Sequence, residues 1–157
     1  MSIPRSVTTV DRMGGVTYTS NVDRVNYTIK ELSRAALRDV AKMLRKKIIL
    51  ELKKLRGMSK LRRIYKAIGY WVRPRDADLQ IGFGNEKKGL SGDTWYAIRQ
   101  ELGTKGQPKR GILRKIVFEN IALIREIEGK YLSAIEDENA ALRLIEEAEQ
   151  TDSGGAD

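Results

Sequence analysis

The strongest pattern in the chain is an apolar stripe with helical spacing between Glu31 and Gly57. Apolar side chains recur there every three or four residues, which brings them onto one face of an α-helix. The stripe consists of Leu32, Ala36, Leu37, Val40, Leu44, Ile48, Leu52 and Leu55. The other faces carry Arg34, Arg38, Lys42, Arg45, Lys46, Lys47, Lys53, Lys54 and Arg56. The pattern predicts a long basic amphipathic helix, which Gly57 is suited to end.

A different pattern follows between Leu61 and Asn85. The segments IYKAIGYWV and LQIGF are rich in β-branched and aromatic residues, and the segment PRDAD between them supplies turn residues at Pro74, Asp76 and Asp78. This arrangement predicts a β-hairpin. The next segment, EKKGLSGD, is polar and typical of a loop, and the segment from 95 to 103 fits either a short helix or a strand.

Helical spacing returns at Leu113 and continues almost to the end of the chain. One face would carry Leu113, Ile116, Val117, Ile121, Ile124 and Ile127, and a thinner stripe follows with Leu132, Ile135, Leu142 and Ile145. Gly129, between the two stripes, is expected to break or kink the helix. The order helix, strands, helix predicts an α+β fold, in which a small antiparallel sheet is packed by a long N-terminal helix and a long C-terminal helix.

This order divides the chain into three parts. Residues 1–30 are expected to form a partly flexible arm, whose VTYTSNV segment is suited to pair as an edge strand. Residues 31–128 would form the α+β core domain, and residues 129–157 an acidic helical extension with a disordered end. A chain of 157 residues suits one core rather than two.

Composition excludes several classes of protein. The chain has no cysteine and no histidine, so disulfides, thiol nucleophiles, His-based triads and the commonest metal ligands are absent. We therefore expect no enzymatic activity, no cofactor and no metal. No apolar run approaches the roughly 20 residues of a membrane span, and the N-terminus lacks the apolar region of a signal peptide. No membrane partner is expected.

The net charge of +9 is unevenly distributed along the chain. The first 125 residues carry 28 Lys and Arg against 11 Asp and Glu, whereas the last 32 carry 2 against 10. A basic body with an acidic tail is typical of nucleic-acid binding or of head-to-tail contact between copies, although both regions also fit ordinary solvated surface. The candidate DNA-facing residues are Arg38, Arg45, Lys53, Arg62 and Arg63.

Other candidate sites are weaker. GFGNEKKG lacks the Gly-Lys-Ser/Thr arrangement of a phosphate loop. The acidic cluster Glu136, Asp137 and Glu138 fits a solvated face better than a metal site, and it also suits a charge-complementary contact between subunits. A small Mg²⁺-dependent nuclease would need its carboxylates to converge in space, and the candidates are Asp76, Asp78, Asp93 and Glu101.

Four short motifs resemble a family of small head–tail joining proteins, also described as tail-completion or minor tail component proteins, of long-tailed bacteriophages. The family's "tGrLrrsI" segment is matched by residues 57–64, and its "vG" turn by residues 79–82. Its "Ya.fvEfGT" motif aligns with residues 96–104, and its "qpaRPFLRpal" motif with residues 107–115. The resemblance covers residues 31–120. Gly111 and Ile112 replace the family's Pro-Phe pair, and Leu102 replaces its aromatic residue before Gly-Thr.

The resemblance implies a structural virion protein made in the bacterial host cytoplasm. Proteins of this family form a ring, commonly of six copies, between the head connector and the tail tube around the DNA channel. Implied partners are further copies of the chain, the head connector or adaptor ring, tail tube or tail terminator proteins, and genomic DNA in the channel. The candidate interface residues are Glu101, Gly103, Thr104, Lys105, Pro108, Arg110, Glu136, Asp137 and Glu138. Gly103 would supply a backbone conformation closed to most residues, and Glu101 would accept hydrogen bonds at the Gly103–Thr104 turn or pair with an arginine. The alternative is a basic nucleic-acid-binding accessory protein.

Overall fold

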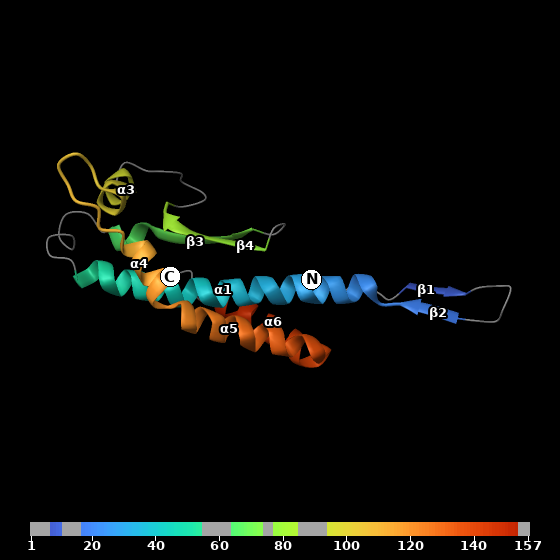
Figure 1. Cartoon of the computed structure of the whole chain (residues 1–157). Helices are drawn as coiled ribbons and strands as arrows, with labels where there is room; N and C mark the ends of the chain where they lie inside the picture. Colours follow the sequence, from blue (N-terminus) through green and yellow to red (C-terminus); the bar gives the residue numbers. More distant parts are fainter. Residues whose placement is uncertain (1–6, 11–16, 55–63, 74–76, 85–93, 154–157) are drawn as a thin grey trace. The chain divides into compact units, whose positions relative to one another are not determined.

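The computed structural model describes residues 7–10, 17–54, 64–73, 77–84 and 94–153. Their elements, in chain order, are β1 (Val7–Val10), β2 (Thr17–Ser20), α1 (Val22–Lys54), η1 (Ile64–Ala67), β3 (Ile68–Arg73), β4 (Asp78–Phe83), α3 (Thr94–Leu102), α4 (Ile112–Glu119), α5 (Ile121–Ser133), η2 (Ala134–Glu136) and α6 (Glu138–Ser153) (Figure 1). Helices dominate, and a small antiparallel sheet packs against the long N-terminal and C-terminal helices. The predicted α+β class is therefore confirmed.

The chain forms two compact units. The central unit comprises Leu37–Gly129, and the terminal unit combines Met1–Ala36 with Lys130–Asp157. The described strands form two separate antiparallel pairs, β1 with β2 in the terminal unit and β3 with β4 in the central unit.

The core of the central unit lies between the second half of α1, the β3–β4 hairpin and the helices that follow it. Its buried members are Val40, Leu44, Ile48, Leu52, Ile68, Ala97, Ile112 and Ile116. The four α1 residues in this set belong to the predicted stripe, which is confirmed. Ile48 is fully buried, and removing a side chain of this size from a close-packed core typically costs about 2–5 kcal/mol.

The predicted hairpin is present and short. β3 and β4 pair antiparallel, with Ile68 opposite Phe83 and Arg73 opposite Asp78. Gly69 permits a close approach at its base, because a Cβ there would lie 2.7 Å from the Gly84 carbonyl oxygen. The segment 64–67, which the sequence assigned to the strand, is instead a short 3-10 helix. Within the predicted turn, Pro74 and Asp76 lie outside the described residues.

The long N-terminal helix, α1, begins nine residues earlier than the sequence pattern predicted. α1 starts at Val22, where the Val25 N–H donates to the Asn21 carbonyl at 3.0 Å. Residues 22–30, which the sequence grouped with the arm, are therefore helical. The VTYTSNV segment does supply a strand, since β2 pairs with β1. The predicted stop at Gly57 and the loop 86–93 lie outside the described residues.

The second helical region differs from its prediction in two respects. The break falls at Asn120 and not at Gly129, which lies within α5. In the terminal unit, the buried residues of the C-terminal segment are Tyr131, Ala134, Ala141 and Ala148, whereas Leu132 and Ile135 are exposed. Small alanine side chains let neighbouring helices approach closely. The predicted stripe was defined by leucine and isoleucine alone, so it did not include these alanines.

Candidate interaction surfaces

The α3–α4 loop, residues 103–111, is held by backbone hydrogen bonds at its base and near its tip. Near the tip, Thr104 and Gln107 exchange two hydrogen bonds, with N–O distances of 2.9 and 3.0 Å. At the base, the Arg110 and Gly111 N–H groups donate to the carbonyls of Gln100 and Glu101, each at 3.2 Å. These bonds return the chain to the end of α3 and hold the loop conformation from within the chain.

Glu101 joins this loop to the next helix. Its carboxylate accepts hydrogen bonds from the backbone N–H groups of Ile112 at 2.8 Å and Leu113 at 2.9 Å, the first two residues of α4. Those N–H groups have no partner within their own helix, and Gly111 at the N-cap has no side chain to supply one. A carboxylate there also interacts favourably with the helix dipole.

The predicted hydrogen bonds from the Gly103–Thr104 turn to Glu101 were therefore wrong. The N–H of Gly103 donates to the Arg99 carbonyl at 2.8 Å, and the N–H of Thr104 to Gln107, so neither is available to the carboxylate. The expectation for Gly103 itself is confirmed. Its φ is +80°, and a Cβ would lie 2.9 Å from the Lys109 backbone nitrogen and 3.1 Å from the Gln107 carbonyl oxygen.

The side chains of the α3–α4 loop face solvent. Every residue from Thr104 to Arg110 is exposed, Pro108 included, and Lys105, Lys109 and Arg110 make the loop strongly basic. Leu102, at the end of α3 directly before the loop, is 65% exposed. We call Leu102, Lys105, Lys109 and Arg110 the basic knob.

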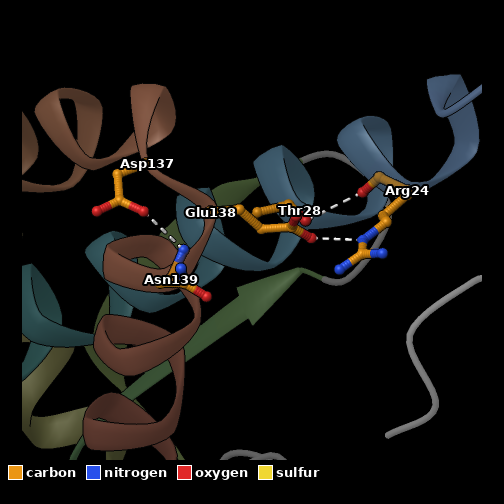
Figure 2. Close-up of polar contacts among 5 residues, drawn as sticks. All are labelled: Arg24, Thr28, Asp137, Glu138 and Asn139. Atoms are coloured by element: carbon orange, nitrogen blue, oxygen red, sulfur yellow. Dashed lines mark hydrogen bonds and ion pairs between the residues drawn. The ribbon is translucent and has the colours of Figure 1, made fainter.

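The acidic cluster is partly used within the terminal unit (Figure 2). The Asp137 carboxylate accepts a hydrogen bond from the Asn139 N–H at 2.9 Å and so caps the start of α6. Glu138 pairs with the Arg24 guanidinium at 2.5 Å. Glu136 is exposed at the end of η2.

The candidate DNA-facing residues have varied surroundings in the central unit. Arg38 is half-buried, and the Arg45 Nε donates to the Ile68 carbonyl at 3.2 Å, so this side chain anchors the hairpin to α1. Lys53 is exposed, and its ammonium lies 5.3 Å from the centre of the Tyr65 ring. Arg62 and Arg63 lie outside the described residues.

The carboxylates of the nuclease hypothesis are not assembled by the described part of the chain. Asp78 is exposed on β4, 3.9 Å from Arg73, and Glu101 caps α4, while Asp76 and Asp93 lie outside the described residues. Among the described residues, no group of three Asp and Glu side chains is placed to hold a metal ion. None of the described helices combines the length and the apolar character needed to cross a membrane.

A feature that the sequence analysis missed is an apolar groove on the terminal unit. Three of its lining residues are apolar and exposed: Val25 at 51%, Ile29 at 40% and Ile135 at 42%. Val22, Val25 and Ile29 have helical spacing, which is the signal that could have revealed it. It was missed because this segment was assigned to the arm.

Comparisons with known proteins do not assign this chain to a family. No family model, no curated protein and no solved structure matches it.

Proposed function

We propose that this protein is a structural component of a tailed bacteriophage that forms a ring in the neck, joining the head connector to the tail tube around the DNA channel. The ring would consist of several copies, six in the family that the sequence resembles. The virion would be its place of action, with the head connector or adaptor ring and the tail tube or tail terminator proteins as its neighbours.

The observation that carries this proposal is the construction of the α3–α4 loop. The "EfGT"-like and "qpaRPFLR"-like motifs meet there, and their key residues have structural roles. Glu101 caps α4, and Gly103 permits the turn that closes the loop. A loop already held by its own backbone presents exposed side chains at a small entropic cost of binding, which suits a protein–protein contact.

Electron microscopy of particles from a phage with a stop codon early in this gene tests the proposal. Filled heads and separate complete tails are the expected result, with joined particles restored by the wild-type gene in trans. Normal infectious particles would overturn the proposal. A Lys109→Glu/Arg110→Glu variant supplied in trans should restore joining poorly, whereas the charge-matched control Arg125→Glu/Arg143→Glu should restore it fully.

The second candidate is a basic nucleic-acid-binding accessory protein. Lys46, Lys53 and Lys54 on α1 are exposed, and such a face is suited to phosphate contacts. This function predicts that the purified protein binds duplex DNA of any sequence. For 6–10 phosphate contacts, affinity should fall by about 10³–10⁵ between 50 and 200 mM salt. Fluorescence anisotropy with labelled duplexes measures this, and no binding at low salt would exclude it.

A further inference from the structure

The groove of the terminal unit combines three apolar lining residues, Val25, Ile29 and Ile135, with polar and charged ones. Arg24, Thr28 and Glu138 line it together with the three apolar residues. Arg24 pairs with Glu138, and the Thr28 hydroxyl donates to the Arg24 carbonyl at 3.0 Å (Figure 2). Arg24, Glu138 and the Thr28 hydroxyl thus have hydrogen-bond partners within the chain. A partner that covers the groove would not need to break these bonds.

Exposed apolar residues extend beyond the groove itself. Val22 is 59% exposed on the same face of α1, and Leu132 is 65% exposed one turn before Ile135. Clustered apolar side chains of this kind mark surfaces that a partner covers, whereas isolated ones need no explanation. The exposed carboxylate of Glu136 follows Ile135 directly in the chain, so the partner should carry positive charge beside an apolar group.

The basic knob has this composition. Leu102 offers an exposed apolar side chain, and Lys105, Lys109 and Arg110 follow it on the backbone-bonded loop. The knob belongs to the central unit and the groove to the terminal unit. Every copy of the chain therefore carries one knob and one groove.

We propose that the basic knob of one copy docks in the terminal-unit groove of a second copy. Leu102 would pack against Val25, Ile29 and Ile135, with Arg110 beside Glu136. Such a head-to-tail contact leaves one knob and one groove open in a pair, so further copies add until a ring closes or a filament grows. This inference rests on the proposed ring and names the two surfaces that build it.

Two single variants test the contact, each disabling one surface. Leu102→Glu replaces the apolar group of the knob with a carboxylate that would face the apolar lining of the groove and the nearby Glu136, and Ile29→Lys sets an ammonium in the groove against the basic knob. Analytical ultracentrifugation of the full chain should show assemblies larger than dimers for the wild type and monomers for each variant. The controls are Leu50→Glu and Leu123→Lys, which change helical residues that are 59% and 40% exposed. Both controls should assemble like the wild type.

Mixing the two variants gives the sharpest result. The Leu102→Glu copy keeps an intact groove, and the Ile29→Lys copy keeps an intact knob, so an equal mixture should associate although neither variant associates alone. Circular dichroism and thermal unfolding verify that both variants are folded. A mixture that stays monomeric, or single variants that assemble like the wild type, would overturn the inference.

Charge reversal provides a test that leaves the apolar residues untouched. Arg110→Glu and Glu136→Lys should each weaken assembly about tenfold at low salt, and the chain carrying both changes should recover most of that loss. An absence of recovery, or a wild-type chain that is monomeric up to its solubility limit, would count against the contact. Particle microscopy decides the neck function separately, because a neck protein that assembles through other surfaces would still give unjoined heads and tails.

Discussion

Glu101 should be the residue on which the α3–α4 loop depends most. Its carboxylate accepts two backbone hydrogen bonds at 2.8 and 2.9 Å from the first turn of α4, and the residue is half-buried. A hydrogen bond to a charged acceptor contributes about 1.5–3 kcal/mol when well shielded, and loss of a helix cap costs about 0.5–2 kcal/mol. Because solvent reaches this carboxylate, the low end applies, and Glu101→Ala should reduce the free energy of unfolding by about 2 kcal/mol.

Glu101→Gln separates geometry from charge. The amide keeps one oxygen acceptor but presents an N–H group to the second backbone donor, so we expect a loss of about 1 kcal/mol. Urea denaturation measures both variants. With a slope of about 2 kcal/mol per molar urea, the alanine variant should shift the midpoint by about 1 M at unchanged slope.

The control is Glu119→Ala, at the other end of the same helix. Glu119 is exposed and lies 3.7 Å from Lys115, and surface pairs of this kind contribute about 0–1 kcal/mol. Its effect should be no more than about 0.5 kcal/mol. An alanine variant of Glu101 no less stable than this control would refute the assignment of Glu101 as the cap that holds the loop.

Three further predictions concern the backbone and one ion pair. Gly103→Ala should lower the free energy of unfolding, measured by urea denaturation, by about 2 kcal/mol, because φ is +80° and the new Cβ meets backbone atoms. The control Gly106→Ala, with open space around it, should leave the stability almost unchanged. Equal losses in the two variants would contradict the prediction. Gly69→Ala should lower the free energy of unfolding by about 1–3 kcal/mol, since its Cβ would lie 2.7 Å from the Gly84 carbonyl oxygen. An unchanged midpoint of urea denaturation would show that the hairpin can open there. The hydrogen bond from Lys54 lowers the pKa of Glu51, so the stabilisation from this pair is present above the ordinary glutamate pKa and is lost as pH falls through the lowered value. Lys54→Ala should raise the pKa of Glu51 in a carbon-13 NMR titration, and no change would exclude the pair.

Local patterns predicted the elements that local rules control. The stripe from Val40 to Leu52 is buried as expected, because a period of 3.6 residues places those side chains on one face whatever lies opposite. The β3–β4 hairpin was predictable for a similar reason, since two β-rich segments flank turn residues. The need for glycine at 103 was also correctly expected from the motif that contains it.

Contacts between residues distant in the chain decided the rest. The helix breaks at Asn120, a buried residue whose side-chain oxygen accepts a hydrogen bond from the Lys47 ammonium at 2.5 Å and whose amide donates to the Ile116 carbonyl at 2.7 Å. Periodicity gives no sign of a partner 73 residues away. Gly129, by contrast, has open space around it and stays helical.

The sequence alone thus determined the class of the fold, the basic helix, the hairpin and the division of charge, all of which follow from neighbouring residues. Tertiary structure alone decided that Glu101 caps α4 from eleven residues away and that Ala134, Ala141 and Ala148 are buried in the terminal unit, whereas Leu132 and Ile135 are exposed. It also decided that Val25, Ile29 and Ile135 line one groove. The physical reason is that burial depends on which surfaces pack together, and residues more than 100 positions apart are brought together only by the folded chain.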